Sequence, residues 1–120
     1  MPDWSIKFIP AKNRQPDKLA DFVLDVPGDP AGPFNVFNGD NVSWNNATQD
    51  DHWPAVYAAV SGGSPSGNPQ PIGNSLKPRT SSDTYSVSAA AGFSIFFCCK
   101  LHAKEVGVLK VIAPSAPPTV

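Results

Sequence analysis

The most apolar stretch of the chain is Gly92-Phe93-Ser94-Ile95-Phe96-Phe97-Cys98-Cys99, and Lys100-Leu101-His102 follows it directly. Successive side chains of a strand point to opposite faces, so a run that is apolar at consecutive positions predicts a strand buried on both sides. We therefore expect a central strand over residues 93–99. The more polar residues after it predict that the strand gives way to a loop before His102.

Other segments on either side of this strand carry strand signals. In residues 4–8, Trp4, Ile6 and Phe8 fall on one face with the two-residue period, and Pro10 is expected to end the strand. Residues 16–26 fit a helical turn or a strand, and we favour a short strand after a turn. The remaining predicted strands are 34–37, 42–44, 85–87 and 106–112. This pattern predicts an all-β, antiparallel Greek-key sandwich of about seven to eight strands.

Turn and loop signals separate these strands. Asn38-Gly39-Asp40 is a strong turn signal and predicts a hairpin between residues 34–37 and 42–44. Residues 61–71 are Gly, Ser, Pro and Asn without an apolar period, and we expect a loop there. The chain length of 120 residues suits a single domain, predicted over 1–112, with a Pro-rich tail over 113–120.

Charge and hydropathy exclude some classes of function. Nine basic and ten acidic residues give a net charge of −1, which provides no electrostatic footprint for nucleic acid. The apolar runs are far shorter than the roughly 20 residues that cross a bilayer, so we expect no membrane span. The N-terminus does not have the layout of a signal peptide.

The only cysteines, Cys98 and Cys99, are adjacent. Their Cα atoms are therefore about 3.8 Å apart, closer than an ordinary disulfide permits. At least one thiol is free for other chemistry. Strand alternation places Cys98 on the face opposite Cys99, which makes Cys98 a candidate core residue.

The sequence Cys99-Lys100-Leu101-His102 places a thiol and an imidazole three positions apart. Both side chains can turn toward one metal ion if the segment folds back on itself. Two ligands are too few for a structural zinc site, and His52 is the only other histidine. Two alternatives stay open: His52 is an ordinary loop histidine beside Asp50 and Asp51, or Cys98 is the sulfur ligand.

The segment Gly39-Asp40-Asn41-Val42-Ser43-Trp44-Asn45-Asn46, followed by His52, resembles cupredoxins of the plastocyanin and amicyanin type. In that family a Gly-Asp-x-Val-x-Trp-x-Asn strand leads to the first copper histidine. The resemblance covers residues 34–112, and the N-terminal third fits it loosely. The family's order of turn, aromatic strand, ligand loop and closing strand is matched by Leu76-Lys77-Pro78, Gly92 with the strand after it, Cys99-x-x-His102 and Gly107-Val108-Leu109-Lys110-Val111.

The resemblance implies one type 1 copper ion per chain, held by His52, Cys99 and His102. It also implies a weak axial ligand a few residues later, which is often Met in the family. Glu105 stands at that place here, and a hard anionic carboxylate favours Cu(II) and lowers the reduction potential. Alternatively, Glu105 faces water and leaves the axial position open.

The implied function is electron transfer by a monomeric, non-enzymatic protein located in the periplasm or outside the cell. Redox partners would dock transiently near His102, on an apolar collar formed by Leu101, Ala103, Trp53 and Pro54. Three alternatives remain: a copper-dependent enzyme acting on a small molecule such as nitric oxide or peroxide, a copper storage or delivery protein, and a metal-free interaction module.

Overall fold

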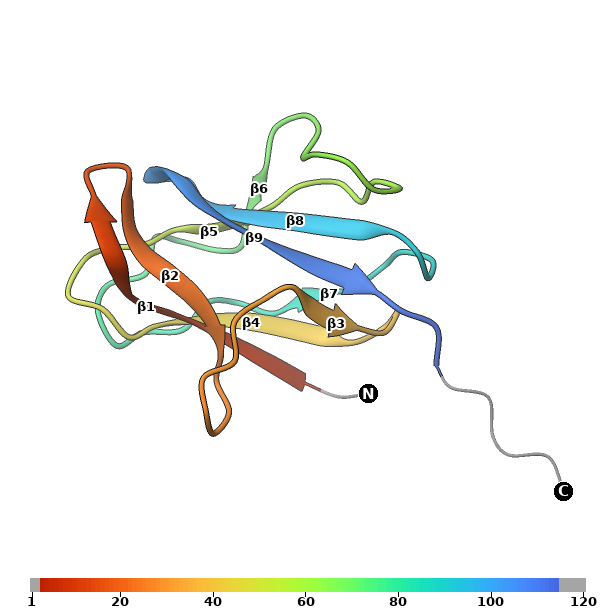
Figure 1. Ribbon diagram of the computed structural model, residues 1–120, viewed down its shortest axis with the longest axis horizontal. Helices are drawn as coiled ribbons and strands as arrows, with labels where there is room; N and C mark the ends of the chain where they lie inside the picture. The colour runs from red at the N-terminus through yellow and green to blue at the C-terminus, as the bar shows by residue number, and fades with distance from the viewer. Residues whose placement is uncertain (1–2, 115–120) are drawn as a thin grey trace, which may run out of the picture.

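Two β-sheets face each other in the computed structural model, which describes residues 3–114 (Figure 1). The described residues contain no helix, so none of them forms one that could cross a membrane. The first sheet has the strand order β2 (Lys18–Leu24), β1 (Asp3–Gln15), β4 (Asn41–Asn46) and β7 (Tyr85–Ser86). The second has the order β3 (Phe34–Val36), β9 (His102–Val111), β8 (Ser94–Cys99), β5 (Pro54–Val56) and β6 (Gln70–Pro71). The predicted β-sandwich is confirmed.

The central position predicted for residues 93–99 is also confirmed, since β8 is the middle strand of its sheet. Phe97 points between the sheets and is fully buried against Trp44 and Phe22, with ring centroids 5.4 and 4.8 Å away. Burial of one such side chain contributes about 2–3 kcal/mol. The Phe97 ring lies against Gly107 of β9, where any Cβ would collide with it. Trp44 and Phe97 thus belong to the core.

Strand β1 differs from the prediction because it continues past Pro10 to Gln15. The pairing of β1 with β4 ends at Phe8, so the missing N–H of Pro10 removes no hydrogen bond from that side. On the other side Pro10 pairs with Ala20 of β2, and the register shifts between Pro10 and Gln15. The turn expected in residues 16–26 is found at 16–17, followed by strand β2.

The predicted hairpin around Asn38-Gly39-Asp40 is wrong. Strand β3 pairs in parallel with β9, whereas β4 pairs in parallel with β1 and antiparallel with β7. The turn is present, with Gly39 at a φ of 93°, but it carries the chain from one sheet to the other. A turn signal specifies a local reversal and leaves the choice of strand partners to the packing. Both sheets are therefore mixed, rather than entirely antiparallel as the strand pattern had predicted.

Two further boundaries differ from the sequence prediction. Strand β9 begins at His102, so the expected loop between Cys99 and residue 106 is reduced to a turn at residues 100–101 and a bulge. In the predicted loop 61–71, residues 70–71 form the short strand β6. Of the predicted tail 113–120, residues 115–120 lie outside the described residues.

Candidate metal centre

His52 lies in the connection between β4 and β5 and is held by a pair of backbone hydrogen bonds. Its N–H donates to the Leu76 carbonyl at 3.0 Å, and the Leu76 N–H donates back at 2.6 Å. The imidazole is fully buried and stacks on the Phe8 ring, with centroids 4.5 Å apart. These contacts fix the ring between the two sheets, so His52 is not an exposed loop histidine.

Cys99 and His102 face each other across the tight turn that joins β8 to β9. The register of this hairpin changes between Cys98, which pairs with Val106, and Cys99, which pairs with His102. Residues 103–105 therefore bulge out of the ladder between these two pairs. This local geometry turns the Cys99 sulfur and the His102 ring toward the same point, with Sγ 3.5 Å from Nδ1.

Glu105 points into the protein and is 1% exposed. Its Oε2 atom accepts hydrogen bonds from the backbone N–H groups of Leu19 at 2.7 Å and Ala20 at 3.0 Å. Its Oε1 atom lies 2.9 Å from Nδ1 of His52. Strand β2 thus holds the carboxylate beside the two histidines, and the alternative in which Glu105 faces water does not occur.

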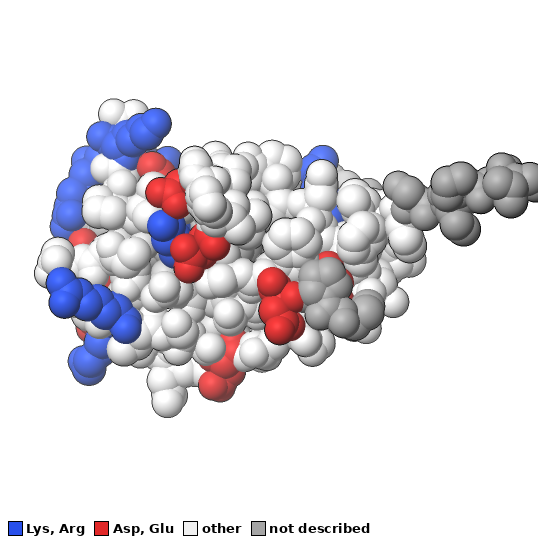
Figure 2. Space-filling model, turned by 90° about the horizontal axis from the view of Figure 1, so that it is seen from below, with Lys and Arg blue, Asp and Glu red and all other residues white. Residues whose placement is uncertain are grey.

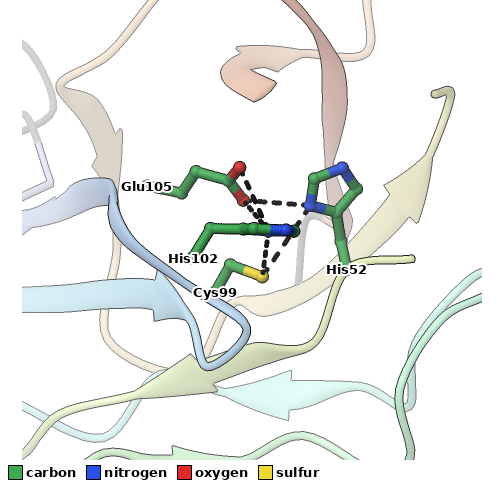
Figure 3. A group of neighbouring side chains, drawn as sticks. All are labelled: His52, Cys99, His102 and Glu105. Carbon is green, nitrogen blue, oxygen red and sulfur yellow. Dashed lines mark hydrogen bonds and ion pairs between the residues drawn. The ribbon is translucent and has the colours of Figure 1, made fainter. Parts of the chain in front are cut away.

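The four predicted residues converge on one small volume (Figure 3). One donor atom from each of His52, Cys99, His102 and Glu105 lies within 4.8 Å of all the others. The Cys99 sulfur is 3.7 Å from Nδ1 of His52, and Nδ1 of His102 is 3.2 Å from Oε2 of Glu105. His102 is the most accessible member, with a side chain that is 13% exposed.

These separations fit a bound metal ion. An ion about 2.3 Å from sulfur and about 2.0 Å from nitrogen, with near-tetrahedral angles, separates those two atoms by about 3.5 Å. The two Sγ–Nδ1 distances of 3.5 and 3.7 Å agree with this value. Thiolate and imidazole suit copper and zinc, and the carboxylate adds a negative charge that offsets a dication. The cluster could therefore hold a metal ion.

The pKa values of the two acids in the cluster move in opposite directions. Burial raises the pKa of the Cys99 thiol from 9.0 to about 11, although the backbone N–H groups of Trp53 and Leu101 donate to its sulfur. Burial also acts to raise the pKa of Glu105, but the hydrogen bond with His52 and the Leu19 N–H outweigh it and lower that pKa. The carboxylate is thus ready to bind a cation, whereas the thiol must lose its proton when metal binds.

Several residues considered from the sequence lie outside the cluster. Cys98 is buried on the opposite face of β8, so Cys99 supplies the sulfur. Asp50 pairs with Arg14 on the surface at 3.0 Å, and Asp51 is exposed. Pro54 is buried within β5 and does not contribute to an exposed collar.

Sequence reasoning missed the groups that position the donors. They are the Phe8 ring under His52, the N–H groups of Leu19 and Ala20 on Glu105, and the Trp53 N–H, which donates to the Cys99 sulfur at 3.2 Å. Every residue except proline has a backbone N–H, so these three donors have no sequence signature. No protein-family model matches this chain, and no curated protein matches it in sequence.

Proposed function

We propose that this protein is a mononuclear copper electron-transfer protein of the cupredoxin kind, with His52, Cys99, His102 and Glu105 as ligands. The observation that carries the proposal is the convergence of one sulfur and two Nδ1 atoms, with Sγ–Nδ1 distances of 3.7 and 3.5 Å. A copper ion bound there would supply one-electron chemistry by alternating between Cu(II) and Cu(I). The sequence resemblance over residues 34–112 favours copper over zinc.

The surroundings of the donors support a carrier rather than an enzyme. His52, Cys99 and Glu105 are at most 2% exposed, so a small-molecule substrate would have to displace one of them. The sandwich holds the donors through backbone pairing, ring stacking and amide hydrogen bonds, which limits their movement when the charge of the site changes. A rigid donor set suits electron transfer, because little reorganisation accompanies the change in oxidation state.

The Trp53 N–H and the Glu105 carboxylate would tune the site in opposite directions. A hydrogen bond to the Cys99 sulfur withdraws charge from the thiolate and raises the reduction potential. An anionic oxygen near the ion favours Cu(II) and lowers that potential. We expect the carboxylate to dominate, because it carries a full negative charge, and we propose a potential below that of sites with a Met axial ligand.

The test is addition of Cu(II) to the protein with reduced thiols, followed by visible absorption and electron paramagnetic resonance spectra. We expect one copper per chain and an intense thiolate-to-copper band. Cys99→Ser should abolish the band, whereas the matched variant Cys98→Ser, which changes the neighbouring thiol on the other face, should keep it. A folded protein that stays colourless with copper, or a band lost only in Cys98→Ser, would overturn the proposal.

A further inference from the structure

Positive charge is concentrated at the end of the sandwich that holds the donor cluster. Seven of the nine Lys and Arg residues fall in three short segments, 12–18, 77–79 and 100–104, which we call the basic end. Figure 2 shows Lys and Arg side chains gathered at one end of the molecule. The β1–β2 turn and the start of β9 lie at the same end in Figure 1.

All three segments border the residues that carry the donors. The Lys104 N–H donates to the Asp17 carbonyl at 2.9 Å, which joins segment 12–18 to the bulge before Glu105. Segment 77–79 directly follows Leu76, the backbone partner of His52. The Lys100 N–H donates to the Trp53 carbonyl at 2.9 Å. The positive charges thus lie at the same end of the sandwich as the site, although they are scattered in the sequence.

Only part of this charge is neutralised locally. Three of the seven cations form ion pairs, which are Arg14–Asp50, Lys18–Asp21 and Lys104–Asp17. Four form none among the described residues, and they are Lys12, Lys77, Arg79 and Lys100. Two exposed carboxylates offset some of their charge: Asp51, next to His52 in the chain, and Asp83, which lines the same surface hollow as Lys77. The whole chain carries a net charge of −1, so the surface outside the basic end is acidic. The molecule therefore has a positive end and a negative remainder.

An apolar spot lies within the basic end. Leu101 is 47% exposed, and it sits in the chain between the exposed Lys100 and the partly buried His102. The His102 edge is the most accessible part of the donor cluster, so it offers the shortest route for an electron between the cluster and a partner. An exposed apolar side chain within a charged surface suits brief docking, in which charge orients the partner and apolar contact brings the redox centres close.

We propose that the basic end, centred on Leu101 and His102, is the docking surface for an acidic redox protein. This inference rests on the proposed electron-transfer function and specifies the chemistry of its partner. The net charge of −1 would by itself slightly repel an acidic protein, but a local field acts over about 8–10 Å at moderate salt. A carboxylate-rich surface that approaches the basic end is therefore attracted by the four unpaired cations more strongly than it is repelled by the acidic rest of the surface.

Poly-L-glutamate serves as the probe, titrated into the protein with and without copper and followed by amide chemical shifts in nuclear magnetic resonance spectra. We expect shifts confined to segments 12–18, 77–79 and 100–104 that weaken as salt is added. Lys77→Glu should weaken binding about threefold. The matched variant Lys110→Glu changes an equally exposed lysine near the far end of β9, about 26 Å along the strand from His102, and should leave binding unchanged.

Equal weakening by Lys77→Glu and Lys110→Glu, or shifts spread over the whole surface, would overturn the docking surface. Tighter binding of duplex DNA or of anionic phospholipid vesicles than of poly-L-glutamate, at the same salt, would replace the acidic protein with that partner and also overturn it. The titration without copper makes the two proposals separable. Failure of the copper spectrum with binding intact would reject the electron-transfer function and keep the acidic-partner surface.

Discussion

The carboxylate oxygen Oε1 of Glu105 lies 2.9 Å from Nδ1 of His52, although the two residues are 53 positions apart in the chain. The second oxygen of Glu105 is held by two backbone N–H groups of β2. Glu105 therefore connects the edge strand of one sheet, the bulged strand of the other sheet and the connection between β4 and β5. Its role in the structure does not depend on a metal.

We expect Glu105→Ala to destabilise the metal-free protein by about 2–4 kcal/mol. The substitution leaves the backbone N–H groups of Leu19 and Ala20 without an acceptor and opens a cavity. Glu105→Gln should cost about 1 kcal/mol, since its amide oxygen can still accept from β2. Urea unfolding of the three proteins measures the difference. Equal losses in both variants would show that the hydrogen bonds to β2 contribute little.

The acid dependence of stability follows from the lowered pKa of Glu105. The unfolded carboxyl has a pKa of 4.5, above the folded value, so the stabilising effect is fully present above about pH 4.5. It is lost as the pH falls through the folded pKa, where the carboxylate becomes protonated. We expect the stability advantage of the wild type over Glu105→Gln to shrink as the pH falls from 6 toward 3. An advantage that stays constant over this range would contradict the lowered pKa of Glu105.

The buried thiols should react slowly in the folded, metal-free protein. Cys98 is 6% exposed and Cys99 is 2% exposed, and burial raises the pKa of both. With a pKa of about 11 rather than 9.0, Cys99 has about a hundredfold less thiolate at pH 8. We expect Ellman's reagent to label two thiols at once in denaturant and neither one rapidly under native conditions. Immediate labelling of the native protein would contradict the burial of the two thiols.

Gly107→Ala tests the close approach of β9 to the core. A Cβ at this position collides with the Phe97 ring, which is fully buried and packed against the rings of Phe22, Phe34 and Trp44. We expect a loss of about 1–3 kcal/mol in the free energy of unfolding. Val106→Ala provides the control on the neighbouring, exposed position of β9 and should cost less than about 1 kcal/mol. Unchanged stability of Gly107→Ala would mean that the Phe97 ring can shift.

The pattern of apolar residues, together with turn signals, predicted much of the architecture. The run Phe93-Ser94-Ile95-Phe96-Phe97-Cys98-Cys99 predicted the central strand, and strand alternation placed Cys98 and Cys99 on opposite faces. The short spacing from Cys99 to His102 also predicted that these two side chains meet. Such features depend on neighbours in the chain, whose relative positions follow from strand and turn geometry.

The sequence by itself thus determined an all-β sandwich, its middle strand and the pairing of one thiol with one imidazole. Only the tertiary structure decided that β3 and β4 join different sheets, that His52 stacks on Phe8 and that Glu105 turns inward onto β2. The physical reason is that these contacts join segments far apart in the chain. Their partners are often backbone N–H groups, which nearly every residue has and which therefore leave no mark in the sequence.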